Sequence, residues 1–277
     1  MRRMGTHEPT IERIIELSGI EMLHPGGMAM TRRTGEVAGL APEMHVLDVS
    51  SGRGTQAIYY AREFAVDVTG LDISEEMVST ASRNAARAGI SDRVRFRQGD
   101  SQRLPFGAGT FDVVINECAV GIPDDSQAVL DEMLRVVRPG GVVVIHESTW
   151  RAPATLAEKA ELSERYGTTP LDRADWVDML ARAGARDIQV ETEPWSRPEM
   201  FWDVRVDRRV RGPGAVLTPF EKAWAALRVA RRFGVAGIRK AFENEREFYR
   251  AVLDGKLGYA LYWGRRPVGP GGVPEQG

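Results

Sequence analysis

The chain has 277 residues, of which 43% are hydrophobic and 27% are charged, and its formal net charge is −2. This length suits one large domain, or a domain with an insertion, and the composition allows a sizeable core. The charge gives no reason to expect a nucleic-acid partner. No apolar run approaches the roughly eighteen residues of a membrane span, and no secretory signal is expected at the start. The single cysteine, Cys118, excludes an internal disulfide, so we expect a cytoplasmic protein.

The chain begins with helical patterns and then enters a strand and a tight turn. Apolar residues predict a short helix over 10–23, the His24-Pro-Gly-Gly27 segment breaks it, and a second helix runs to about Leu40. The segment from His45 to Asp48 predicts a strand. Small residues follow it, and then a helix begins; the small residues are Ser50, Ser51, Gly52 and Gly54. A strand, a small-residue turn and a helix N-terminus together bind nucleotide-like ligands, because the backbone amides approach the ligand closely.

Two ligand classes fit this turn. The run Gly52-Arg-Gly54-Thr-Gln-Ala57 fits the G-x-G-x-x-A dinucleotide pattern, with Asp72 at about the expected distance of twenty residues. S-adenosylmethionine is the second class. Asp48 favours it, because dinucleotide sites usually carry an apolar residue at that place in the strand.

The next two strands of the first half also end in acids. Residues 66–73 predict a strand that ends at Asp72, and residues 94–101 predict one that ends at Asp100. Asp72 can accept hydrogen bonds from ribose hydroxyls, and Asp100 can accept one from an adenine amino group, with the Ser101 backbone amide nearby. Ser74 and Gly89 are typical of the start and stop of the helix between these strands.

Later segments complete an alternating pattern of strands and helices. Strands are predicted at 111–116, 142–148, 187–193 and 257–264, and helices at 126–138, 172–184, 199–211 and 219–252. Between Arg197 and Arg250 there are thirteen Lys or Arg and seven Asp or Glu. This excess is either a solvated helical face or a set of arginines that attracts an anionic substrate.

Five segments carry a resemblance to a known family. They are V-L-D-V-S-S-G-R-G (46–54), G-L-D-I-S (70–74), G-D-S-Q-R-L-P-F (99–106), F-D-V-V-I-N (111–116) and L-R-V-V-R-P-G-G (134–141). In this order and spacing the chain resembles the class I S-adenosylmethionine-dependent methyltransferases. It is most similar to the small-molecule, methyltransferase type 11-like branch, which includes quinone, sterol and arsenite methyltransferases. One position departs from the pattern, because Ser50 replaces the first loop glycine; we expect a negative φ there and an altered loop.

The resemblance implies an α/β fold, a Rossmann-like three-layer sandwich. Its sheet is seven-stranded and mostly parallel, with the last strand antiparallel beside the sixth. Residues 1–43 would form a helical segment over the cofactor, 44–196 the cofactor-binding core, 197–254 a helical cap and 255–266 the final strand. Residues 267–277 are rich in Pro and Gly and are expected to form a flexible tail.

The resemblance also implies a donor site and an acceptor site. The donor is S-adenosyl-L-methionine, leaving as S-adenosyl-L-homocysteine, and the residues expected to bind it are Asp48, Ser50, Ser51, Gly52, Gly54, Asp72, Ile73, Asp100, Ser101 and Asn116. Candidate catalytic residues are Glu117, His146 and His24. Candidate substrate contacts are Glu117, Glu147, Trp150 and Trp202. His146 also fits a packed core residue, and Glu117 a structural carboxylate.

The expected reaction is in-line methyl transfer to a small-molecule acceptor, anionic or aromatic. No His, Asp or Glu cluster has metal-ligand spacing, so no metal is expected. Two alternatives stay open: a nicotinamide-dependent oxidoreductase, and a non-catalytic protein that only binds the cofactor. Nothing in the sequence fixes an oligomeric state.

Overall fold

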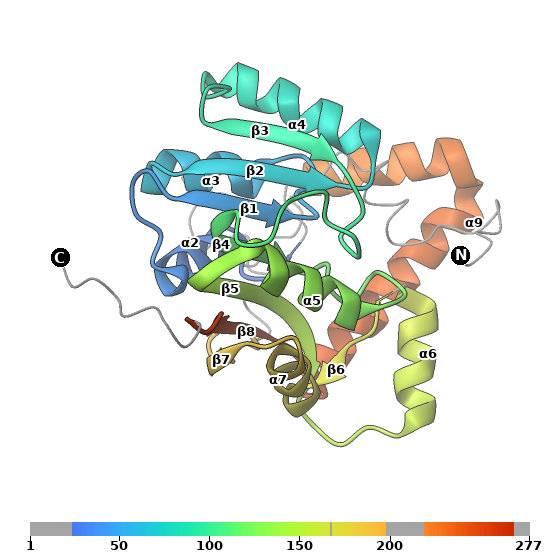
Figure 1. Cartoon of the computed structure of the whole chain (residues 1–277). Coiled ribbons are helices and arrows are strands. Elements are labelled where there is room, and N and C mark those ends of the chain that lie inside the picture. Colours follow the sequence, from blue (N-terminus) through green and yellow to red (C-terminus); the bar gives the residue numbers. More distant parts are fainter. Residues whose placement is uncertain (1–23, 167, 198–218, 269–277) are drawn as a thin grey trace.

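The computed structural model describes residues 24–166, 168–197 and 219–268 (Figure 1). The helix predicted at 10–23, the helical segment at 199–211, Trp202 and most of the C-terminal tail lie outside the described residues.

The described residues form one sheet of eight strands, in the order β3-β2-β1-β4-β5-β8-β7, with the short β6 paired to β5. The strands are β1 (His45–Val49), β2 (Asp67–Asp72), β3 (Val94–Gln98), β4 (Phe111–Glu117), β5 (Val137–Trp150), β6 (Leu171–Asp172), β7 (Arg186–Glu191) and β8 (Leu257–Arg265). The five strands from β3 to β5 in this order pair with their neighbours in parallel. β8 lies between β5 and β7 and is antiparallel to both. The predicted mixed sheet with an antiparallel last strand is confirmed, and β6 adds two residues that the sequence pattern did not indicate.

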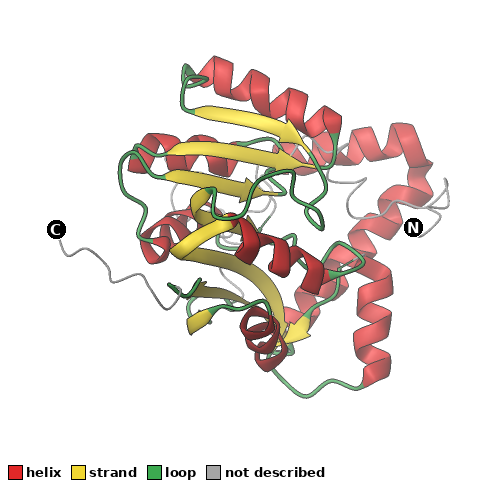
Figure 2. Ribbon diagram, in the orientation of Figure 1, coloured by secondary structure: helices red, strands yellow, loops and turns green. Residues whose placement is uncertain are grey.

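Helices cover both faces of this sheet, giving three layers (Figure 2). The helices are α2 (Gly27–Ala38), α3 (Thr55–Phe64), α4 (Glu75–Ala88), α5 (Ser126–Val136), α6 (Leu156–Tyr166), α7 (Arg173–Arg182) and α9 (Pro219–Leu253). One core cluster joins the sheet to α2, α3, α4 and the end of α9, and the other joins it to α5 and α7. Val143 and Val144 of β5 are both fully buried, because that central strand is covered on both faces.

Local sequence signals explain several helix ends. Ser74 caps α4, since its hydroxyl accepts the Met77 N–H at 3.3 Å, and Gly89 ends that helix with a φ of 70°. Some boundaries were predicted less well. α5 ends at Val136 rather than 138, and β5 starts at Val137 rather than 142, because the chain passes directly from helix into strand there. α6 was not predicted.

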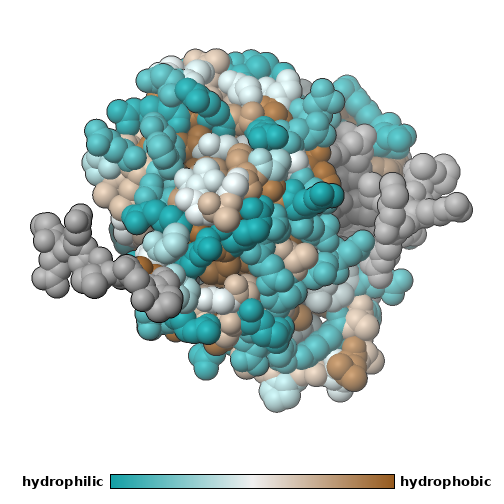
Figure 3. Space-filling model, viewed as in Figure 1, coloured by the Kyte–Doolittle hydropathy of each residue, from teal (hydrophilic) through white to brown (hydrophobic). Residues whose placement is uncertain are grey.

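Hydrophilic residues cover most of the face seen in Figure 3, and apolar residues appear there as small separate areas. Among the residues that the structure describes, no helix combines the length and the apolar character needed to cross a bilayer.

The turn after β1 corrects one prediction. Ser50 has a φ of 62°, not the negative value expected. The Ser51 N–H donates to the Leu71 carbonyl at 2.9 Å and the Gly52 N–H donates to Asp72 at 2.9 Å. These two bonds hold the loop against β2, and in that position the backbone is left-handed at residues 50, 52 and 54. Serine therefore takes a conformation that glycine adopts more easily.

We expect Ser50→Gly to stabilise the protein by about 1 kcal/mol, because it removes the cost of a left-handed residue with a Cβ. The measurement is the free energy of unfolding in urea. Ser51→Gly is the matched control: φ is not positive there, so glycine should lower stability by roughly 0.5–1 kcal/mol through chain entropy. An equal response of the two variants would contradict this account of the turn.

Candidate functional site

Parallel pairing brings the ends of β1, β2 and β4 to one edge of the sheet. Val49, the last residue of β1, pairs with Leu71 on one side and with Asn116 on the other. The loops that follow these three strands therefore start side by side at the carboxyl edge, where open α/β sheets bind their ligands.

The small-residue turn opens at one glycine and packs closely at another. A Cβ built at Gly52 would meet nothing within 4 Å, whereas one built at Gly54 would collide with the Phe96 ring. Gly54 thus allows the first turn of α3 to lie against β3. At Gly52 no described atom blocks the approach to its backbone, and the predicted cofactor contact there stays a prediction.

Asp72 stands at the end of β2 and organises this turn. Its carboxylate accepts the N–H groups of Gly52 and Ser74, each at 2.9 Å, and the residue is 9% exposed. Ile73 beside it is 70% exposed, so its side chain is accessible to a ligand at this edge.

Asp100 and Ser101 follow β3 in the neighbouring loop. The Asp100 carboxylate is exposed and accepts the Gln102 N–H at 2.9 Å, and Ser101 is buried. This bond forms a local turn, so Asp100 has a structural function, and its contact with adenine stays a prediction.

Buried polar atoms at this edge have no hydrogen-bond partner; they include Oδ2 of Asp48, Oγ of Ser51 and Nδ2 of Asn116. Buried polar atoms are nearly always satisfied, so each such atom calls for an explanation, and a polar ligand supplies one. Burial, and then the charges of Glu117 and Asp72, raise the pKa of Asp48 well above its usual range. A carboxyl group, an amide and an open glycine backbone together fit a cationic amino-acid group such as the methionine part of S-adenosylmethionine.

Glu117, at the end of β4, joins the sheet to the segment before β1. Its buried carboxylate accepts hydrogen bonds from Thr31 at 2.9 Å and from Tyr60, and it pairs with Nε2 of His24 at 2.8 Å. Burial alone would raise the pKa of Glu117, but the charge and hydrogen bond of His24 outweigh it and hold the pKa at about 2. Glu117 is therefore ionised and fully engaged. The sequence pattern indicated neither Tyr60 nor Thr31 as a partner of Glu117, because neither has a motif around it.

His146 lies beside Glu117 in register and is fully buried. Both of its ring nitrogens lack a hydrogen-bond partner. Its ring contacts those of His24 and Tyr259, with centroids 5.4 and 5.1 Å away. Burial, with the charge of His24, lowers its pKa to about 3, so the imidazole is neutral. The side chain is buried as expected of a core histidine, yet its polar atoms are left unsatisfied.

The other predicted substrate contacts have structural partners. The Glu147 carboxylate accepts the N–H groups of Val120 at 2.6 Å and Gly121 at 3.4 Å, and burial raises its pKa to about 7. Trp150 donates from Nε1 to the Pro170 carbonyl at 2.9 Å. The structure thus brings Glu117, His146 and His24 into one cluster and gives Glu147 and Trp150 separate roles in holding loops. No group of three potential metal ligands occurs in the described part of the chain.

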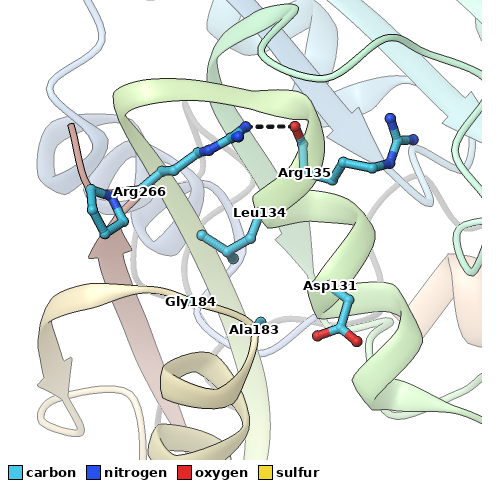
Figure 4. Close-up of a pocket in the computed structure, with 7 residues that line it drawn as sticks. Asp131, Leu134, Arg135, Ala183, Gly184 and Arg266 are labelled. Carbon is cyan, nitrogen blue, oxygen red and sulfur yellow. Dashed lines mark hydrogen bonds between the residues drawn. The ribbon is translucent and has the colours of Figure 1, made fainter. Parts of the chain in front are cut away.

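A separate pocket of about 310 Å³ lies where α5, α7 and β8 end, away from the carboxyl edge (Figure 4). Arg266 crosses it and donates to the Arg135 carbonyl at 2.7 Å. A helix that follows a parallel strand ends at the amino edge of the sheet, and this pocket lies at such helix ends. It shares no residue with the candidate site at the carboxyl edge.

Comparisons with known proteins identify the family. A model described as a methyltransferase domain matches residues 46–141. Phosphatidylethanolamine N-methyltransferase of Cereibacter sphaeroides is 33% identical over 59% of this chain and 80% of its own length. The chain therefore belongs to the class I S-adenosylmethionine-dependent methyltransferases.

Solved structures show that the fold is shared more widely than the activity. The [4+2]-cyclase SpnF superposes with a TM-score of 0.70 at 21% identity, over 96% of this chain and 100% of that one. Haemonchus contortus phosphoethanolamine N-methyltransferase 2, in complex with S-adenosyl-L-methionine, gives 0.69 at 17% identity, over 94% of this chain and 58% of that one.

The His24–Glu117 pair predicts a pH dependence of stability. Burial by itself lowers the pKa of His24, but Glu117 outweighs it and the pKa rises above 6.5. The folded state then holds the His24 proton more tightly than the unfolded state does. The pair's contribution to the free energy of unfolding is therefore complete below pH 6.5 and is lost as the pH rises through the raised pKa. Glu117→Gln should lower the free energy of unfolding by about 3 kcal/mol at pH 6 and flatten its decline above pH 6.5.

Urea unfolding between pH 6 and 9 measures this effect. The control is Glu147→Gln, which removes a carboxyl group whose pKa is raised from 4.5 to about 7. The contribution of Glu147 to the free energy of unfolding is lost mainly between pH 4.5 and 7. The decline of that free energy above pH 7 should therefore persist in Glu147→Gln. A decline above pH 7 that is unchanged in Glu117→Gln would exclude the pair as its source.

Proposed function

We propose that the protein transfers a methyl group from S-adenosylmethionine to a small-molecule acceptor by in-line displacement. The observation that carries the proposal is the carboxyl edge itself: unpartnered Asp48 and Asn116 atoms beside the open backbone of Gly52. When bound, the donor supplies a methyl group already activated by a positive sulfur. The protein must then align the acceptor and exclude water, and such alignment can supply roughly 7–11 kcal/mol.

The proposed donor contacts follow the order of the strands. Asp72 binds the ribose hydroxyls, Asp100 and the Ser101 amide bind the adenine, and Ile73 packs on the adenine face. The methionine part is bound by the turn after β1, through Asp48, Ser50, Ser51, Gly52 and Gly54, with Asn116 near the sulfonium. In support, the Ile73 side chain is exposed, so a ligand can pack on it, and Oδ2 of Asp48 has no hydrogen-bond partner.

On the acceptor side, the proposal assigns different roles to the three clustered residues. His146 contacts the acceptor, because its ring nitrogens are the polar atoms of the cluster that have no partner. Glu117 and His24 position it, since their own polar atoms already bind each other. Glu147 and Trp150 act through the loops that they hold rather than by contact with the acceptor.

The proposed acceptor carries a negative charge or an aromatic ring. The excess of Lys and Arg between Arg197 and Arg250 supports an anionic molecule. Two similar proteins are named for phosphatidylethanolamine and phosphoethanolamine, which contain phosphate. None of the proteins compared above is named as a nicotinamide enzyme.

The first test measures donor binding. Calorimetry should detect binding of S-adenosylhomocysteine and of S-adenosylmethionine to the protein, and no binding of NADH. Asp72→Asn should weaken binding by about 2 kcal/mol, roughly thirtyfold, because a charged hydrogen-bond acceptor is lost. Asp67→Asn, at the exposed opposite end of the same strand, should leave affinity unchanged. Unchanged affinity in Asp72→Asn would refute the ribose contact.

The second test separates turnover from binding. Donor with a labelled methyl group is incubated with a panel of anionic, phenolic and amine acceptors, and label transfer is counted. Because a cyclase shares this fold, donor binding without transfer to any acceptor would favour the non-catalytic alternative.

His146→Phe should raise the free energy of unfolding by about 1 kcal/mol, because a buried unpartnered polar ring is replaced by an apolar one. The same change should lower turnover of any acceptor found above by at least about a hundredfold. His45→Phe, at a largely exposed histidine, is the control and should change neither quantity. A destabilised His146→Phe that keeps full activity would overturn the assignment.

A further inference from the structure

Three carboxyl groups stand on one face of the sheet at its carboxyl edge. Asp48 pairs with Gly70 of β2 and with Ile115 of β4. Asp72 and Glu117 each lie two residues further along those strands. Side chains two residues apart on a strand point to the same face, so Asp48 is flanked by an acid on either side.

The surroundings of Asp48 oppose a negative charge on it. It is 2% exposed and one of its oxygens has no partner. Glu117 is held ionised by His24. Because the positive charge of His24 is already paired with Glu117, it does not compensate a charge on Asp48. In the absence of a ligand cation, a third carboxylate would be buried next to two others, which is costly.

We infer that Asp48 is protonated in the empty site and releases its proton when the cationic donor binds, so that the site distinguishes donor from product by charge. This inference rests on the proposed function. The donor carries a sulfonium and an ammonium group, whereas S-adenosylhomocysteine keeps only the ammonium. The Asp48 O–H bond breaks, its proton passes to solvent, and the carboxylate formed is balanced by the ligand cation.

The consequence is a pH-dependent preference for the donor. Where Asp48 is protonated in the empty site, release of one proton raises donor affinity by about tenfold per pH unit. The product has one positive charge less, so it releases a smaller fraction of the proton and its affinity rises less steeply. Product therefore leaves more easily, relative to donor, as the pH rises.

Other titratable groups face Asp48 or lie near it and need controls. Asp72 on β2, Glu117 on β4 and Tyr60 on α3 interact with it directly. His24 and His146 lie beyond Glu117. Glu147, whose pKa is also raised by burial, is on the opposite face of the sheet, because it follows His146 in the strand.

The test is calorimetric titration with S-adenosylmethionine and with S-adenosylhomocysteine at pH 7, each in phosphate and in Tris buffer. Tris releases much more heat than phosphate when it takes up a proton. The difference in binding heat between the two buffers therefore counts the protons released on binding. We expect a release approaching one proton for the donor and less for the product. Asp48→Asn should bind the donor with no dependence on buffer, and Asp67→Asn, at the exposed far end of β2, should behave as the wild type.

The outcomes separate this inference from the proposed function. If neither molecule gives binding heat, the proposed function fails. If both bind and the donor's heat does not depend on buffer in the wild type, the inference is wrong; it is also wrong if Asp48→Asn keeps the wild-type dependence. Infrared difference spectra need no variant: the carbonyl stretch of a protonated carboxyl should disappear when donor is added, and its persistence would overturn the assignment.

Discussion

The pairing of β1 with β2 and β4 is the constraint on which the candidate site depends. Because all three strands run in parallel and in register, Val49 ends level with Leu71 and Asn116. The loops that follow must then share one edge, and the acids at the strand ends must face each other across it. A shift by one residue in any of these strands would turn its acid to the other face.

The cost of that arrangement is met by a few specific contacts. The buried charge of Glu117 is stabilised because the side chains of His24, Thr31 and Tyr60 bind its oxygens. Asp72 is tolerated because two backbone N–H groups do so. These contacts also attach α2 and the turn after β1 to the sheet, so the groups that neutralise the acids are the same ones that shape the site.

Several features of the site are unfavourable for the ligand-free fold. Ser50 has a left-handed backbone, Asp48 keeps an unpartnered oxygen, and His146 keeps two unpartnered nitrogens. Strain and unsatisfied polar groups concentrate at functional sites, where a ligand supplies what the fold withholds. Their occurrence together at the carboxyl edge, against well-satisfied acids nearby, agrees with a binding site there.

The sequence by itself determined the family and, apart from α6 and β6, the order of strands and helices. It also indicated the donor-side candidates. These features depend on local patterns: strands that end in Asp48, Asp72 and Asp100, a small-residue turn, and the cap at Ser74. The sequence did not determine the φ of Ser50, which follows from hydrogen bonds to β2, or the extension of β5 back to Val137, which follows from pairing with its neighbours. Only the tertiary structure brought together the cluster that we propose for the acceptor side. His24, Thr31, Tyr60, Glu117 and His146 are far apart in the chain, and their contacts arise from packing between layers, which leaves no period or spacing in the sequence.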